Sequence, residues 1–243
     1  MNSMTPKYKR VLLKLSGEAL MGDRDFGLDP VMMKRVAQEI KQVSEMGVQL
    51  ALVIGGGNIF RGVKGASVGM DRTTADHMGM LATVINCLGM KDALEKAGLG
   101  CRVHTGIEMN AVAEPFIRGR AINQLKKGCV VLFGAGTGNP YFTTDSGAAL
   151  RAAETSCDAL LKATKVDGIY DSDPEKNPTA QRFERITYQE VLSQDLEVMD
   201  QTAIALTRQS NIPIVVFSLL KEGEMAKVIC GQGRYTLVTG EEA

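Results

Sequence analysis

The segment Val11-Leu12-Leu13-Lys14-Leu15-Ser16-Gly17 decides the fold. It is a near-continuous apolar run that ends in a turn, as expected of a strand in a parallel sheet covered on both faces. Lys14 interrupts the run, and its charge is costly in such a strand unless it has a partner. One interpretation is an edge-strand lysine whose ammonium group reaches water. The other is a cation aimed at a phosphate beside the Ser16-Gly17 turn.

Working outward from this strand, similar runs recur along the chain. Including the first, they are Arg10–Leu15, Val48–Ile54, Gly100–His104, Cys129–Phe133, Ala159–Lys162 and Ile212–Phe217. The amphipathic segments between them are Pro30–Met46, Arg72–Ala97, Glu114–Leu125, Ser146–Thr155 and Gln201–Gln209. Pro30 follows Asp29, a combination typical of a helix start. The alternation predicts an α/β fold with a mostly parallel central sheet and helices on both faces, and Tyr235–Thr239 is a candidate closing edge strand.

Composition narrows the possible classes of function. The chain has 243 residues, 44% of them apolar, so it can bury a full core. Lys plus Arg total 28, as do Asp plus Glu, and the resulting zero net charge argues against a general nucleic-acid binder. No apolar run approaches the ~18 residues that span a membrane, and the polar start of the chain carries no secretory signal. Five cysteines without a CxxC pair predict buried reduced thiols and a cytoplasmic protein. His77 and His104 lack neighbours at the spacing of a zinc site.

Glycines gather where predicted strands end. Gly55-Gly56-Gly57-Asn58 follows the strand at 48–54. Three glycines let backbone N–H groups approach an anion closely, and Arg61 can add a fork of donors. A tight turn is the plain alternative. The position favours a binding loop, because open α/β sheets bind ligands at the carboxyl ends of their strands.

Two later segments also combine a strand end with polar residues. The run from Gly134 to Ser146 supplies glycine amides, threonine hydroxyls and Asp145, although Asp145 could be no more than a helix N-cap. The run from Lys162 to Pro174 carries a second lysine and then Tyr170 beside carboxylates. That arrangement can flank a purine ring, and its plain alternative is a solvated acidic turn.

Several common signatures are missing or misplaced. The chain lacks GxxxxGK[ST], which argues against a P-loop NTPase. Asp25-Phe26-Gly27 spells DFG, but no HRD-type loop precedes it and it lies too near the N-terminus for a protein kinase. The glycines at 55–57 do not form GxGxxG, which disfavours a dinucleotide fold.

Taken together, these segments resemble the amino acid kinase superfamily and, within it, the bacterial UMP kinases. The match covers essentially the whole chain. It is carried in order by KLSG at 14–17, GGGN with FRG at 55–62, DHMGMLAT at 76–83, GTGNPYFTTDSGAA at 136–149 and KATKVDGIYDSDP at 162–174. The superfamily shares the glycine loops and the lysines. The segments at 76–83 and 137–145 are typical of the UMP branch rather than of acetylglutamate, aspartate or carbamate kinases.

The resemblance implies an amino acid kinase fold in a single domain, 1–243, with an acceptor lobe up to about residue 150 and a nucleotide lobe after it. It implies transfer of the γ-phosphoryl group of ATP to UMP, with Mg²⁺ as cofactor, GTP as activator, UTP as inhibitor and a homohexamer as the assembly. The implied catalytic residues are Lys14, Asp145, Lys162 and Lys165. ATP would lie against Lys14, Leu15, Ser16, Gly17, Gly57, Arg61, Thr164, Tyr170 and Asp173. UMP would lie against Gly56, Asp76, Thr137, Gly138, Asn139, Pro140, Tyr141, Phe142, Thr143 and Thr144, with Asp76 on the nucleoside hydroxyls. The effector GTP would meet Gly22, Asp23, Arg24, Asp25, Phe26 and Gly27.

The implied chemistry needs no general base, because a phosphate monoester with a second pKa of about 6 is mostly a dianion at neutral pH. Catalysis would consist of positioning two polyanions and stabilising charge, with Asp145 orienting the lysines. Mg²⁺ would stay mainly on phosphates and water. Which of Lys162 and Lys165 meets the γ-phosphate stays open. So do two alternatives: a kinase of a small carboxylate or carbamate, with a basic pocket in place of Asp76, and a nucleotide-sensing regulator, which would have lost Lys14 or Asp145.

Overall fold

The computed structural model describes residues 5–60, 69–196 and 198–240. The strands of this part are β1 Arg10–Leu15, β2 Gln49–Ile54, β3 Cys101–Thr105, β4 Glu114–Pro115, β5 Val130–Gly134, β6 Ala159–Thr164, β7 Arg185–Thr187, β8 Ile214–Ser218 and β9 Tyr235–Thr239. The helices are α1 Pro30–Glu45, α3 Arg72–Lys96, α4 Arg118–Lys126, α5 Thr144–Glu154, α6 Tyr188–Ser193, α7 Gln201–Gln209 and α8 Glu224–Ile229, with a 3₁₀ turn, η1, at Gly17–Leu20. Asp29 caps α1 and Pro30 is its first residue, as predicted.

The strands form one sheet in the order β4-β3-β5-β2-β1-β6-β8-β9-β7. Every neighbouring pair is parallel except β8 and β9. The prediction of a mostly parallel α/β sheet is therefore confirmed. Strands from before residue 150 lie on one side of the β1–β6 pair and strands from after it lie on the other, so the sheet runs unbroken through both proposed lobes.

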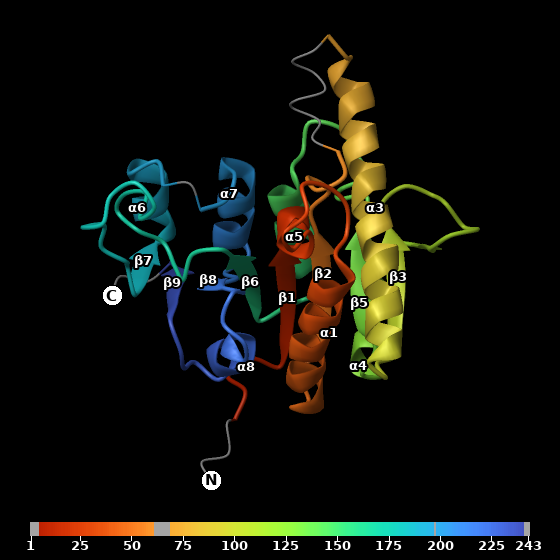
Figure 1. Cartoon of the computed structure of the whole chain (residues 1–243), viewed down its shortest axis with the longest axis horizontal. Helices are drawn as coiled ribbons and strands as arrows, with labels where there is room; N and C mark the ends of the chain where they lie inside the picture. Colours follow the sequence, from red (N-terminus) through yellow and green to blue (C-terminus); the bar gives the residue numbers. More distant parts are fainter. Residues whose placement is uncertain (1–4, 61–68, 197, 241–243) are drawn as a thin grey trace.

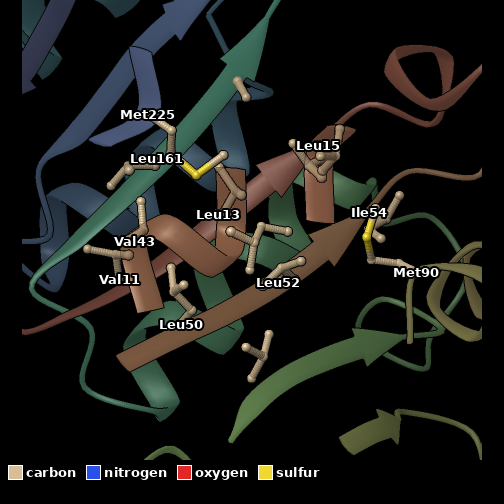
Figure 2. Packing of buried hydrophobic residues seen from close by; sticks show 14 of the residues in the cluster. Val11, Leu13, Leu15, Val43, Leu50, Leu52, Ile54, Met90, Leu161 and Met225 are labelled. Carbon is tan, nitrogen blue, oxygen red and sulfur yellow. The ribbon is translucent and has the colours of Figure 1, made fainter. Parts of the chain in front are cut away.

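Helices cover both faces of the sheet, because strand side chains alternate and both sets are apolar. Val11, Leu13 and Leu15 join a core with α1, α3 and α8. Figure 2 shows these side chains together with Val43 of α1 and Met90 of α3. Leu12 joins a second core with α4, α5 and α7 on the opposite face. Burial on both faces explains the near-continuous apolar runs in the sequence.

Some predicted boundaries are wrong. The helix expected at Glu114–Leu125 begins only at Arg118, and Glu114-Pro115 pairs with β3 instead. Pro115 biases the preceding residue toward extended backbone, which delays the helix. Tyr235–Thr239 is a strand, but β7 lies outside it and closes the sheet. The strand β7 escaped prediction because three residues carry too little periodicity to detect.

The carboxyl ends of the central parallel strands lie at the same edge of the sheet. In Figure 1 the arrows of β1, β2, β3 and β5 point toward this edge, and α3 projects past it. The loops that follow β1, β2, β5 and β6 are the glycine-rich and lysine-bearing segments of the sequence. The topology therefore gathers them at one edge, where open α/β sheets bind ligands.

Candidate active site

Lys14 and Lys162 are direct partners across β1 and β6. Lys14 emerges on the face that Leu12 shares with α5, because alternate residues of a strand share a face. Like charges directly opposite each other destabilise a sheet. Asp145, in the first turn of α5, compensates for them. Its carboxylate oxygens lie 2.8 Å from Lys14 Nζ and 3.2 Å from Lys162 Nζ.

These three side chains are nearly withdrawn from water, with exposures of 11% for Lys14 and 16% for Asp145 and Lys162. Burial by itself raises the pKa of the Asp145 carboxyl, but the two ammonium groups outweigh it and hold that pKa below its usual 3.8. Burial lowers the pKa of Lys162, and Asp145 opposes that shift. Asp145 is thus an ionised carboxylate that orients two cations. It is not the N-cap of α5, because the Thr143 hydroxyl accepts the N–H groups of Asp145 and Ser146.

The two predicted lysines of the later segment occupy different environments. Lys162 joins the buried cluster and also donates to the Val198 carbonyl. Lys165 lies just beyond β6 and is exposed. Within the described chain, only the first of the two is brought to Lys14 and Asp145.

Two glycine turns lie against each other beside this cluster. The Ser16 hydroxyl accepts the N–H of Ala19 and caps η1. A Cβ atom on Gly17 would stand 2.2 Å from Asn58 Oδ1 and 2.6 Å from the Gly55 carbonyl oxygen, so no side chain fits there. The turn after β1 is thereby packed on the turn after β2. Arg61, predicted to contact ATP, lies outside the described residues.

A cleft of about 240 Å³ opens between α3 and the loops that follow β2 and β5; we call it the α3 cleft. It contains most of the residues predicted for the acceptor, and Gly57, predicted for ATP, lines it too. Its lining is Gly56, Gly57, Phe60, Arg72, Ala75, Asp76, Gly79, Met80, Thr83, Gly136, Thr137, Asn139, Phe142, Thr143 and Thr144. Gly138, Pro140 and Tyr141 belong to the same loop but are not part of this lining.

Asp76 is held at the mouth of the α3 cleft by two partners. Arg72 Nε donates to both carboxylate oxygens at 2.9 Å, and the Tyr141 N–H donates to Oδ2 at 2.8 Å. The Arg72 guanidinium also lies 5.5 Å from the centroid of the Tyr141 ring. Sequence reasoning missed Arg72, although its position four residues before Asp76 on a helix was a usable signal.

The loop after β5 holds an unusual backbone conformation. Ala135 and Tyr141 have φ angles of 60° and 71°, and Gly136 and Gly138 also have positive φ. A Cβ atom on Gly138 would stand 2.5 Å from the Gly106 carbonyl oxygen. Such conformations persist only where the surroundings fix them, and they concentrate at binding sites.

Asp200 is a second residue that sequence reasoning missed. Its carboxylate accepts the hydroxyls of Thr143 and Ser146 and the Ser146 N–H. It also caps α7 by accepting the Ala203 N–H at 2.9 Å. It therefore ties the start of α5, which carries Asp145, to the start of α7. An acidic residue just before a predicted helix signals a cap, but nothing in the sequence signals the bond to α5.

A second cleft, of about 680 Å³, lies beyond the carboxyl ends of β6 and β8; we call it the β6 cleft. Lys162, Thr164, Tyr170 and Asp173 line it, together with Val166, Gly168, Ile169, Asp171, Ser172, Pro174, Lys176, Gln194, Asp195, Leu196, Val198 and Val216. The Tyr170 hydroxyl donates to Asp167 at 2.6 Å, which fixes the ring. Since Lys162 lines this cleft and Thr143 and Thr144 line the α3 cleft, Asp145 lies where the two approach each other.

The segment Gly22–Gly27, predicted for an effector, is a mostly exposed loop apart from both clefts. Arg24 pairs with Asp29 at 3.3 Å, and the Phe26 side chain is 66% exposed. The loop is linked to the turn after β2, because Asn58 Nδ2 donates to the Gly27 carbonyl at 2.8 Å.

No group of three or more His, Cys, Asp or Glu side chains in residues 5–60, 69–196 and 198–240 is placed to hold a metal ion. Nor does any helix in those ranges have the length and apolar character needed to cross a bilayer. All five cysteines are free; three are buried, and Cys129 and Cys230 are partly exposed.

Comparison with known proteins identifies close relatives. The sequence model described as the amino acid kinase family matches residues 9–218. A protein named uridylate kinase from Paramagnetospirillum magneticum is 57% identical over 235 residues, 97% of this chain and 98% of that protein. One of the same name from Erythrobacter litoralis is 57% identical over 96% of this chain and 98% of its own length. The solved structure of UMP kinase from Bacillus anthracis matches with a TM-score of 0.93 at 40% identity, covering 97% of both chains.

Proposed function

The chain belongs to the amino acid kinase family, and on that premise we propose that it transfers the γ-phosphoryl group of ATP to UMP, giving UDP and ADP. The observation that carries the proposal is the buried Lys14–Asp145–Lys162 cluster between two clefts. Its relatives named uridylate kinase and UMP kinase are full-length matches, which supports UMP as the acceptor.

The cluster suits transfer between two anions. Lys14 and Lys162 hold adjacent positive charges at one edge of the sheet, and Asp145 keeps their ammonium groups at fixed places. In-line transfer demands that charge on the moving phosphoryl group meets donors already in position. The acceptor phosphate needs no deprotonation by the protein, since it is mostly a dianion at neutral pH. We assign the lysines to charge stabilisation and Asp145 to their orientation.

The two clefts suggest a separate binding site for each substrate. In the proposal, UMP occupies the α3 cleft, with Asp76 near the ribose and the loop at 137–144 around the uracil. ATP occupies the β6 cleft with its base beside Tyr170 and its phosphates toward Lys162 and the Ser16-Gly17 turn. Asp76 would then exchange part of its bonding to Arg72 and Tyr141 for the nucleoside hydroxyls. This division corresponds to an acceptor lobe before about residue 150 and a nucleotide lobe after it.

Mg²⁺ is the cofactor that the donor would bring with it. Asp145, in the cluster, and Asp200, which bonds to the start of the same helix, are engaged with lysines, hydroxyls and amides. The donor set therefore fits an ion that enters on the ATP phosphates and keeps its water ligands. When bound there, Mg²⁺ would neutralise phosphate charge. Lys14, Lys162 and the glycine amides would hold the oxygens that the ion leaves exposed.

We also propose how the protein is regulated and how it assembles. We expect activation by GTP through the Gly22–Gly27 loop, inhibition by UTP, a cytoplasmic location and a homo-oligomer, with a hexamer as the expected size. An exposed apolar stripe on α3 supports self-association. Met78, Leu81 and Ile85 lie on one face of the helix and are 38%, 48% and 50% exposed.

The acceptor is tested by comparing kcat/KM for UMP and CMP with ATP as the donor. Uracil offers an N3–H donor and carbonyl acceptors, whereas cytosine reverses the pattern at two atoms. A loop matched to uracil would leave buried groups unpaired against cytosine, at about 1–3 kcal/mol per group. We expect a clear preference for UMP. Equal kcat/KM values for the two nucleotides, or activity on aspartate, glutamate or carbamate instead, would refute the proposed acceptor.

A further inference from the structure

Two asparagines form a closed, buried pair behind the glycine turns. Asn58 lies in the turn after β2 and is 2% exposed, while Asn86 lies on α3 and is fully buried. Asn58 Nδ2 donates to Asn86 Oδ1 at 3.1 Å, and Asn86 Nδ2 donates to Asn58 Oδ1 at 2.7 Å. Buried side-chain amides are costly unless their hydrogen bonds are made, so this pair has a defined geometry to maintain.

The remaining amide hydrogens of the pair reach two separate backbone segments. Asn86 Nδ2 donates to the Gly55 carbonyl at 2.6 Å, and Asn58 Nδ2 donates to the Gly27 carbonyl at 2.8 Å. The backbone N–H of Gly27 donates in return to the Asn58 carbonyl at 2.9 Å. Each Nδ2 group therefore uses both of its hydrogens, one within the pair and one outside it.

The pair also bears on the turn after β1. Asn58 Oδ1 and the Gly55 carbonyl are the atoms that would collide with a Cβ atom on Gly17. The Gly55 N–H donates to the Leu15 carbonyl at 2.9 Å. The backbone from Leu15 to Gly17 is thus confined on one side by the atoms that the asparagine pair fixes.

We propose that Asn58 and Asn86 are positioning residues that hold the turns at Ser16-Gly17 and Gly55–Gly57 in the form that receives the donor phosphates. The inference rests on the proposed function, in which the Ser16-Gly17 turn faces the ATP phosphates and the Gly55–Gly57 turn packs against it at the edge of the α3 cleft. Neither side chain needs to touch substrate, because both act through the Gly17 and Gly55 backbone. Efficient phosphoryl transfer requires hydrogen-bond donors that are already close to the positions they occupy in the transition state. The asparagine pair, anchored on α3, restrains the backbone of the two turns in this way.

The test compares Asn86→Ala with Met90→Ala. Met90 is another buried residue of α3, but it packs in the core with α1 and lies outside the amide network. Asn86→Ala leaves a polar space that water can enter, so the variant can fold while the turns lose their anchor. Steady-state kinetics below the melting temperature, calorimetric ATP binding and hydrogen exchange at the 17–20 amides are measured for both variants.

We expect Asn86→Ala to raise the KM for ATP about tenfold, since about 1.4 kcal/mol of binding is tenfold. Its KM for UMP should rise less, because Asp76 and the loop at 137–144 contact UMP in the proposal without this pair, and exchange at 17–20 should quicken. Met90→Ala should lower the melting temperature without either change. The inference is overturned if the two variants share one kinetic pattern, or if exchange at 17–20 is the same in Asn86→Ala and wild type. A wild type that used ATP on another acceptor would refute UMP as substrate, and the ATP comparison would still decide the role of Asn86.

Discussion

At the scale of single residues, Lys14 determines the character of the site. Its charge sits in a central strand with β2 and β6 on either side, so the explanation of an edge-strand lysine is wrong. The Asp145 carboxylate compensates for the burial of the Lys14 charge. Lys162 lies opposite Lys14 on the neighbouring strand β6. A pair of like charges is retained here at a cost to stability, which is expected of a binding site rather than of a structural element.

Lys14→Met tests that role. Methionine keeps the length of the side chain but removes the charge, and Asp145 keeps Lys162 as its partner. Loss of a donor that acts mainly on the transferring group should lower kcat on the order of 10²–10³-fold while UMP affinity, measured by calorimetry, stays nearly constant. Lys41→Met, which breaks a surface pair on α1, is the matched control. Retained kcat in Lys14→Met would remove this lysine from the mechanism.

Asp76→Asn tests feedback by UTP through the acceptor site. UTP carries the uracil and ribose of UMP, so its extra phosphates would extend toward Lys14 and compete with ATP. Removing a charged hydrogen-bond partner should weaken both ligands by about 1.5–3 kcal/mol. UTP inhibition is measured at several UMP concentrations, and we expect rising UMP to relieve it. A variant that loses UTP inhibition but binds UMP normally would indicate a separate effector site.

At the scale of elements, the loop after β5 is held by contacts rather than by its own propensity. Thr83 of α3 accepts the Ala135 N–H at 2.8 Å, so α3 anchors this loop as Asn86 anchors the turn after β2. The long helix therefore contacts both groups of substrate-facing backbone. The position of α3 on the sheet therefore influences how far the loop after β5 lies from the turn after β2.

Gly138→Ala tests this loop. A methyl group there meets the Gly106 carbonyl oxygen at 2.5 Å, in addition to the strain of φ +81°. Gly128→Ala is the matched control, because φ is +79° but nothing lies within 4 Å of the added carbon, and Gly128 lines neither cleft. We expect the KM for UMP to rise at least tenfold more in Gly138→Ala than in the control, since a displaced loop loses hydrogen bonds worth about 0.5–1.5 kcal/mol each. Equal KM values for UMP in the two variants would contradict this account.

At the scale of the whole molecule, the exposed stripe on α3 predicts assembly. Leu81→Glu and Ile85→Glu together would place two charges on an apolar face that association would bury, where an unpaired charge is costly. We expect the assembly to dissociate toward smaller species in sedimentation velocity. Leu220→Glu alters another exposed leucine, 61% accessible and away from α3, and should leave the assembly intact. An unchanged mass for the double variant would exclude this face as the interface.

The sequence by itself determined the fold class and the identity of most candidate site residues. Apolar runs of strand length indicate strands buried on both faces of a sheet. Glycines at strand ends indicate where the backbone approaches a ligand. Both features are patterns of neighbouring residues, so they can be recognised in the sequence. The resemblance of several ordered segments added the acceptor. The sequence predicted the first residues of helices less well. The helix predicted from Glu114 begins only at Arg118, after Pro115.

Only the tertiary structure decided which of these residues meet. Periodicity does not specify strand order, so the pairing of Lys14 with Lys162, and the contact of Lys162 with Asp145, came from the packing of β1, β6 and α5. The hydrogen bonds of Asp200 to α5, and of Asn86 to Gly55, join segments far apart in the chain. The physical reason is that such contacts depend on how whole elements pack, whereas each residue's own neighbours in sequence determine only its local conformation.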